Sequence, residues 1–226
     1  MASVDADVDY AEALLSALTE VQGDFSAGEL AYLALTSKVE LPVRDRLAFR
    51  LSQQLPEGLF VAREWRRVDL AVLEEGPEAL PRMLLEAKAL YSFDLVGPPK
   101  WATRYPDLVE RDVAKLRAMG SMPVDVQAFV LVLATHPVTE ISASLRHIAK
   151  YATGVAKAVQ LMGDPDAVAA EARQRLLGHL RALGPVREGK MNGGTAYGVE
   201  INVLYWLFGP IPLTSIERDA RSVRSG

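Results

Sequence analysis

The feature that most constrains this sequence is a pair of apolar, strand-like segments that carry charged residues. Residues 68–73 contain Asp69, and residues 83–90 contain Glu86 and Lys88. Burying a charged side chain without a partner is costly, so charges inside such segments indicate that partners lie close by. In a strand, residues i and i+2 point to the same face, so Glu86 and Lys88 emerge side by side. If the two strands pair, two carboxylates and an ammonium group converge, as a site for a divalent cation and an anionic substrate requires.

Composition limits the class of protein. Of the 226 residues, 50% are hydrophobic and 24% are charged, which is typical of a globular domain with a buried core. The absence of cysteine excludes disulfides, a thiolate nucleophile and a cysteine zinc site. Without a signal segment or a membrane-spanning apolar run, we expect a cytoplasmic protein that does not associate with membranes. The net charge of −4 argues against indiscriminate nucleic-acid binding but leaves a local basic groove open.

Hydrophobic periodicity and turn residues predict an α/β order of elements. We expect N-terminal helices within residues 8–36 and a further helix over 41–54. Three strands follow, then a helix and a fourth strand, over residues 58–65, 67–74, 82–90, 107–119 and 126–134. The remaining expected elements are helices at 139–161 and 166–183 and a last strand at 196–208, with the segment from residue 92 to 105 as an ordered loop.

The order helix, three strands, helix, strand, with an acid in the second strand and Glu-x-Lys in the third, resembles the PD-(D/E)XK nuclease superfamily. Asp69, Glu86 and Lys88 match its motif, and Val68 stands where the nominal pattern has proline. The resemblance covers about 41–134 plus 196–208. It implies one domain over 1–226 with a restriction-endonuclease-like core (αβββαβ), whose mixed central sheet is flanked by helices. Additional N-terminal helices (8–36) and a helical insertion (139–183) before the last strand would complete it.

That resemblance implies a Mg²⁺-dependent nuclease, most simply a DNA endonuclease, with Mn²⁺ able to substitute and a homodimer for duplex cleavage. Asp69, Glu86 and the Ala87 carbonyl would be the metal ligands. Carboxylate and carbonyl oxygens are hard ligands that suit Mg²⁺. Lys88 would orient the attacking water and neutralise charge in the transition state.

Further site residues are less constrained by the pattern. A third acid could come from Glu64, or from Glu40 or Asp45 in the preceding helix, with a surface position as the alternative for each. Lys115 and Arg67 are candidate phosphate contacts. Asp112 and Lys115 lie three residues apart on a helix, so an intrahelical ion pair explains them equally well.

Other features of the sequence point to structural roles. A second Glu-x-Lys, Glu188-Gly189-Lys190, lies in a glycine-rich segment and is predicted to be a solvated turn. His136, beside a proline, is interpreted as an ordinary loop residue. The aromatic residues Trp65, Trp101 and Tyr105 could stack on bases, but packing roles are favoured.

Two functions of other classes compete with the nuclease. The first is a non-catalytic nucleic-acid-binding or scaffold module of a defence or repair complex that retains the nuclease fold. The second is a metal-dependent hydrolase of a small phosphorylated substrate. The acidic net charge favours the module, whereas the intact set of Asp69, Glu86 and Lys88 favours an enzyme.

Overall fold

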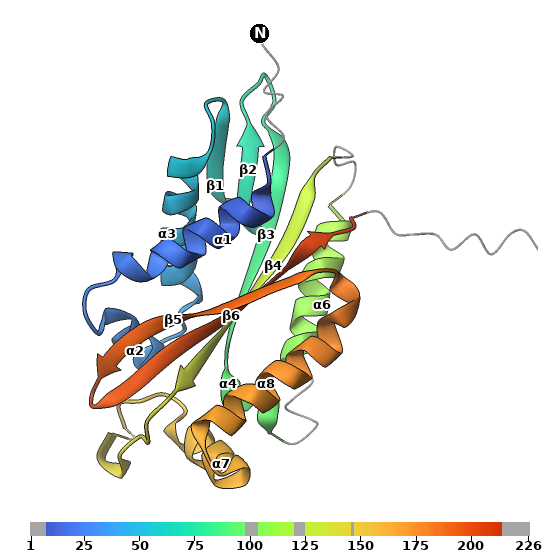
Figure 1. The fold of residues 1–226 in the computed structure, drawn as a ribbon. Helices are drawn as coiled ribbons and strands as arrows, with labels where there is room; N and C mark the ends of the chain where they lie inside the picture. Colours follow the sequence, from blue (N-terminus) through green and yellow to red (C-terminus); the bar gives the residue numbers. More distant parts are fainter. Residues whose placement is uncertain (1–7, 98–103, 120–124, 146, 214–226) are drawn as a thin grey trace, which may run out of the picture.

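The structure, a computed structural model, describes residues 8–97, 104–119, 125–145 and 147–213. Its centre is a six-stranded mixed sheet with strand order β1-β2-β3-β4-β6-β5 (Figure 1). The strands are β1 (Leu59–Trp65), β2 (Val68–Glu74), β3 (Leu80–Tyr91), β4 (Gln127–Pro137), β5 (Val186–Ala196) and β6 (Val199–Ile211).

Helices cover both faces of the sheet. The first group is α1 (Tyr10–Val21), α2 (Glu29–Thr36) and α3 (Glu40–Gln54), which share one hydrophobic core with the sheet. The second group is α4 (Ser92–Val96), α6 (Arg104–Arg117) and α8 (Pro165–Leu180), which pack in a second core on the opposite face. The helix α7 (Ala152–Met162) contributes to both cores. In the described part of the chain, no helix is both long and apolar enough to cross a bilayer.

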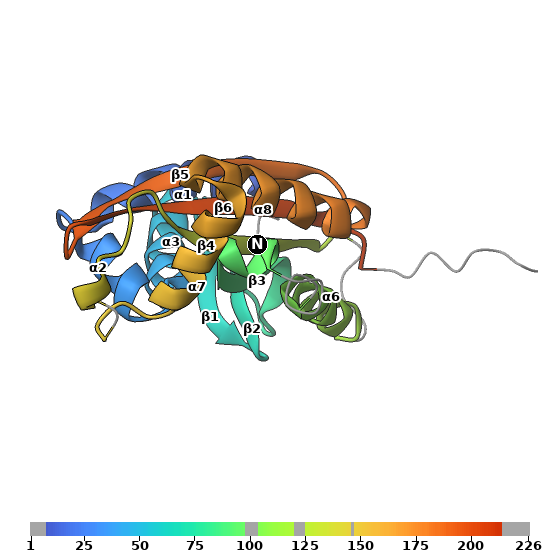
Figure 2. The ribbon, with the colours of Figure 1, turned by 90° about the horizontal axis from the view of Figure 1, so that it is seen from below.

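The direction of the strands follows from their connections. The first three strands form an antiparallel meander, and β3 then runs parallel to β4. Because a parallel pair needs a crossover, the chain passes through α4 and α6 before it returns as β4. The strands β5 and β6 form a hairpin that pairs antiparallel with β4. In both views α3 and α6 lie on opposite sides of β3 (Figure 1, Figure 2).

The central strand β3 is covered on both faces, which explains its nearly continuous apolar sequence. The side chains of Leu85, Ala87 and Ala89 lie in the core shared with α1, α2 and α3. Since side chains alternate along a strand, Glu86 and Lys88 point to the other face, toward α6. These two residues therefore interrupt the second core rather than the first.

The predicted order of elements from 41 to 134 is present, with boundaries shifted by a few residues. The helix expected over 139–161 is wrong in its first half, because the α-helix starts only at Ala152, after Tyr151 with φ 61°. A 3₁₀ turn, Ala143–Leu145, lies in the earlier part. The loop expected after β3 contains the short helix α4.

The second Glu-x-Lys is also not a solvated turn. Glu188, Gly189 and Lys190 lie in β5, which pairs with β6 throughout this segment. His136 is likewise not a loop residue: it lies in β4, is 3% exposed, and its Nδ1 lies 2.9 Å from Ser92 Oγ. Trp101 lies outside the described residues.

Candidate active site

The candidate site forms where β2 separates from β3. The ladder between these strands runs from Glu74↔Leu80 to Leu70↔Leu85, whereas β3 remains paired with β4 as far as Tyr91. Beyond Leu85, backbone N–H groups on the β2 side of β3 need other acceptors. Two carboxylates meet this need.

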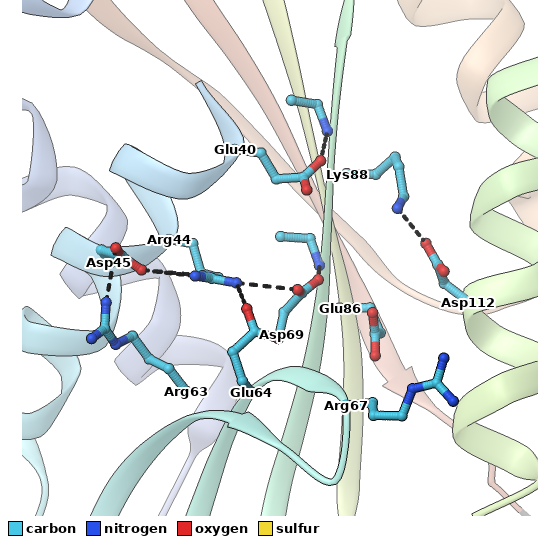
Figure 3. A network of polar contacts seen from close by, with 12 residues as sticks. Glu40, Arg44, Asp45, Arg63, Glu64, Arg67, Asp69, Glu86, Lys88 and Asp112 are labelled. Carbon is cyan, nitrogen blue, oxygen red and sulfur yellow. Dashed lines mark hydrogen bonds and ion pairs between the residues drawn. The ribbon is translucent and has the colours of Figure 1, made fainter. Parts of the chain in front are cut away.

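Asp69 Oδ2 accepts the N–H of Ala87 at 2.8 Å, and Glu40 Oε2 accepts that of Ala89 at 2.8 Å (Figure 3). Asp69 comes from the start of β2 and Glu40 from the first turn of α3. The local separation of the strands thus fixes two acidic side chains against the backbone that carries Glu86 and Lys88.

Glu86 and Lys88 each meet an oppositely charged residue of α6. Lys88 Nζ lies 3.0 Å from Asp112 Oδ2, and the Lys115 ammonium group contacts Glu86 Oε1. These contacts run between helix and strand, so the alternative of an Asp112–Lys115 intrahelical pair is wrong. Neither Glu86 Oε1 nor Asp112 Oδ2 accepts a hydrogen bond of good geometry, so charge attraction alone compensates them.

A buried arginine completes the network on the other side of Asp69. Arg44 of α3 is 6% exposed, and its guanidinium group lies 3.4 Å from Asp69 Oδ1 and 3.1 Å from Asp45 Oδ1. The same group contacts Glu64, whose side chain is largely exposed (Figure 3). Apart from Glu40, which binds the β3 backbone, every carboxylate described above therefore already has a cationic partner from the protein.

Burial makes Glu86 the most perturbed acid of the site. Glu86 is only 3% exposed, and burial raises the pKa of its carboxyl group from 4.5 to about 7. The Lys115 contact lowers this pKa, whereas the negative charges of Asp69 and Asp112 raise it further. Strong perturbation by burial together with specific charged neighbours is typical of functional sites.

Lys88 is shifted in the direction that keeps it charged. Burial lowers its pKa, but the Asp112 carboxylate, helped by Glu40 and Asp69, raises it, and the net shift is upward. Lys88 is consequently an ammonium ion at neutral pH. It can stabilise negative charge, and it is not suited to remove a proton from water.

The β1–β2 hairpin loop holds two arginines beside the site. Trp65 and Val68 pair with each other across the two strands, and Arg66 and Arg67 form the two-residue loop between them. Both arginines have positive φ (47° and 69°). Positive φ at both loop residues is the pattern of a type I′ turn, which favours Asn-Gly rather than side chains as large as arginine. The Arg67 carbonyl oxygen accepts a hydrogen bond from Lys115 Nζ at 2.8 Å.

The structure brings the three predicted central residues into one electrostatic group. Asp69 and Glu86 lie on neighbouring strands, and the negative charge of Asp69 raises the pKa of both Glu86 and Lys88. Of the further candidates, Lys115 contacts Glu86, Glu40 binds the β3 backbone, and Glu64 and Asp45 bind Arg44.

Sequence reasoning missed Arg44. Its signal was its place in the apolar stripe of α3, where the neighbouring buried residues are Val43, Leu47, Ala48 and Leu51. A charge inside such a stripe needs a buried partner, just as a charge inside a strand does.

The site offers a divalent cation two acidic side chains, Asp69 and Glu86. Within the described residues, no group of three or more His, Cys, Asp or Glu side chains is arranged to hold a metal ion. Mg²⁺ commonly keeps several waters and is held by one or two carboxylates, so Asp69 and Glu86 suffice in kind and number. A bound cation would neutralise the carboxylates of Asp69 and Glu86, which Arg44 and Lys115 neutralise in this structure.

No family model matches the chain, and neither a curated protein nor a solved structure shows significant similarity to it. Function is therefore inferred from the geometry of the site and from its motif.

Proposed function

We propose that the chain is a Mg²⁺-dependent nuclease of the PD-(D/E)XK type, acting on DNA as an endonuclease. The observation that carries the proposal is Glu86. A carboxylate only 3% exposed, with Asp69 and Asp112 as like-charged neighbours and Lys88 two residues away, is costly for folding. Such an arrangement is expected where a cation and a phosphate are to be bound.

Each residue has a chemical role under this proposal. Asp69 and Glu86 would hold the cation, with the Ala87 carbonyl as a further candidate ligand. When bound, Mg²⁺ supplies a water of lowered pKa and a positive charge beside the phosphate. Lys88, kept protonated by Asp112, stabilises the charge that develops on the phosphate oxygens. Lys115 and Arg67 are the proposed phosphate contacts.

The restriction-endonuclease-like core belongs to the same proposal. It is supported by the order α3-β1-β2-β3-α6-β4 and by the position of the acids where β2 leaves β3. In the superfamily that the chain resembles, cleavage of both strands of a duplex usually uses two active sites, so we further propose a homodimer. The molar mass in solution, measured by light scattering with and without duplex DNA, tests this point.

The test uses a pair of matched variants. Lys88→Ala removes the proposed catalytic ammonium, and Lys190→Ala removes the exposed lysine of the second Glu-x-Lys in β5. Plasmid, linear and single-stranded DNA and RNA are incubated with Mg²⁺, Mn²⁺ or EDTA. We expect metal-dependent cleavage that falls at least a hundredfold in Lys88→Ala and is unchanged in Lys190→Ala. Cleavage that survives Lys88→Ala, or is lost equally in both variants, contradicts the proposal.

A second candidate is the non-catalytic binding or scaffold module. The observation that favours it is the pairing of the acids with the protein's own cations, Arg44 with Asp69 and Lys115 with Glu86. In that case the charges serve the fold. Metal-independent DNA binding without cleavage of any substrate, and no thermal stabilisation by Mg²⁺ or Mn²⁺, would support the module over the enzyme.

A further inference from the structure

A cavity of about 610 Å³ lies beyond the end of β3, between α4, the first turn of α6 and α7. It is separate from the acids of the candidate site but connected to them by two elements. Strand β3 carries Glu86 and Lys88 and leads directly into α4. Helix α6 places Tyr105 at the cavity and Asp112 at the site, about 10 Å apart along the helix axis.

Aromatic rings form part of the cavity wall. Phe93, Tyr105 and Tyr151 line it, and the Tyr91 ring lies behind them, with its centroid 5.2 Å from that of Phe93 and 4.9 Å from that of Tyr151. Tyr151 is 54% exposed and has φ 61°, a conformation that costs a residue with a side chain about 1 kcal/mol or more. This strained residue places a largely exposed ring at the cavity.

Positive charge surrounds these rings. Among the described residues that line the cavity, Lys38, Arg104 and Lys157 are cations and Asp94 is the one acid. Lys38 Nζ lies 5.8 Å and Arg104 Cζ 5.9 Å from the centroid of the Tyr105 ring. In this described part of the lining, the excess of cations over carboxylates favours an anionic ligand.

The Asp94 carboxyl group is held in place within the cavity wall. Asp94 Oδ2 accepts the backbone N–H of Tyr91 at 3.0 Å. Burial raises the pKa of Asp94, and the Tyr91 N–H and the Tyr105 hydroxyl oppose that rise. Asp94 thus offers a hydrogen-bonding group of fixed position among the rings, where a ligand's amino group can be recognised.

We propose that this cavity binds a nucleotide, with its base against the Tyr151 and Tyr105 rings and its phosphate at Lys38, Arg104 and Lys157. Flat aromatic walls beside cations fit a ligand that joins an aromatic ring to a phosphate, and they fit a simple anion or a lipid chain less well. The volume is within the usual range for small-ligand sites. Resting on the proposed function, we assign the nucleotide to the nucleic-acid substrate, as a nucleotide whose base has left the stack and lies at the Tyr105 end of α6, about 10 Å along the helix axis from Asp112.

The test measures binding in EDTA, so that cleavage plays no part. The probes are the four common nucleoside monophosphates, studied by calorimetry, and fluorescent DNA duplexes with or without one unpaired base, studied by anisotropy. Tyr151→Leu removes the ring and keeps an apolar side chain. Tyr197→Leu is the matched control, because Tyr197 is also exposed and has positive φ (53°) but lies in the β5–β6 turn. Lys157→Gln and Lys190→Gln form a second pair.

We expect the duplex with an unpaired base to bind at least tenfold more tightly than the fully paired duplex. Tyr151→Leu should remove that preference, since stacking on an aromatic side chain contributes this much per base. Lys157→Gln should weaken binding and reduce its salt dependence. Tyr197→Leu and Lys190→Gln should leave both measurements unchanged.

The outcomes separate this proposal from the nuclease. Binding of free monophosphates that Tyr151→Leu abolishes, without any preference for the unpaired base, would keep the nucleotide site but overturn its assignment to the substrate. Equal behaviour of Tyr151→Leu and Tyr197→Leu with every probe overturns the site itself. Because no metal is present, these results do not depend on whether Lys88→Ala stops cleavage.

Discussion

Lys88 on β3 and Asp112 on α6 form an ion pair at 3.0 Å that joins the central strand to the helix of the crossover. Both side chains are mostly buried, with exposed fractions of 23% and 18%. A pair of this kind strongly destabilises a protein when one member is removed, because the other charge stays buried without a partner. The pair is therefore structural as well as a proposed part of the site.

The first prediction concerns this pair. Lys88→Met and Asp112→Leu should each lower the free energy of unfolding by about 1–3 kcal/mol, whereas the double variant should lose less than the sum of the two. Urea unfolding of the four proteins gives the coupling energy. The Arg187–Glu12 pair, in which Glu12 is largely exposed, is the comparison and should show a much smaller coupling. Strict additivity at Lys88 and Asp112 would contradict the ion pair.

The second prediction is that Glu86→Gln stabilises the protein, and more so as the pH rises. Glu86 has a pKa of about 7 in the folded chain and about 4.5 in the unfolded chain. Between pH 4.5 and about pH 7, the Glu86 carboxyl group is ionised in the unfolded chain but still protonated in the folded chain. The free energy of unfolding therefore falls as the pH rises through this range. Without metal, Glu86→Gln should gain up to about 3 kcal/mol over the wild type at pH 8.

Urea titrations at pH 5, 6, 7 and 8 measure this difference. The exposed Glu75→Gln is the control for replacing a surface carboxyl group by an amide. A Glu86→Gln variant that loses stability relative to the wild type as the pH rises would show that the carboxylate is stabilising where it lies.

The third prediction concerns His136, whose burial lowers its pKa below the usual 6.5, with Asp166 opposing that shift. Above pH 6.5 both states are neutral at this residue. Below it, only the unfolded chain takes up the proton readily, so folding stability falls as the pH drops from 6.5 toward the folded pKa. His136→Asn should reduce this loss between pH 6.5 and 5.

Because Glu86 changes stability in the opposite direction over part of this range, the measurement belongs in the Glu86→Gln background. The exposed His179→Asn provides the comparison, because it removes an imidazole from the surface. An unchanged slope in His136→Asn would contradict the prediction.

The fourth prediction concerns the loop Arg66-Arg67. Replacing it by Asn-Gly supplies residues that adopt positive φ with less strain, so the free energy of unfolding should rise by about 1–2 kcal/mol. The Lys115 bond to the residue-67 carbonyl stays available, because it uses the backbone. If the arginines contact phosphate, DNA affinity should fall at the same time, with a shallower dependence on salt.

The β5–β6 turn offers the control for that change. Tyr197 and Gly198 also form a two-residue loop with positive φ at both positions. Tyr197→Asn should stabilise the protein modestly without affecting DNA binding. Equal DNA affinity for the Arg66-Arg67 variant and the wild type would remove these arginines from the proposed interface.

The central sheet was predictable from the sequence because its strands are apolar and punctuated by turn residues. The β5 segment was not, since its glycines are typical of a loop. In the structure, Gly189 lies under the Tyr205 ring, where an added Cβ would be 2.3 Å from the hydroxyl oxygen. The glycine is required by a side chain of the neighbouring strand, and that pairing has no local signal in the sequence.

The candidate site was predictable only where its residues lie in apolar strands, and not where they depend on tertiary contacts. Asp69, Glu86 and Lys88 lie in strands whose pattern shows them to be unusual. Their partners Arg44 and Asp112 come from helices on opposite faces of the sheet, and only the tertiary fold brings them within reach. A charged residue in an amphipathic helix is ordinary, so the helical pattern alone does not show which charged residues face the site.

Where β2 separates from β3, two backbone amides of β3 become sensitive to the state of nearby acidic side chains. The amide protons of Ala87 and Ala89 are held by the side chains of Asp69 and Glu40 rather than by a neighbouring strand. If either carboxylate is protonated or binds a cation, its hydrogen bond from the alanine N–H becomes weaker or changes its geometry. The chemical shifts of the Ala87 and Ala89 amide protons will therefore report on the charge of Asp69 and Glu40.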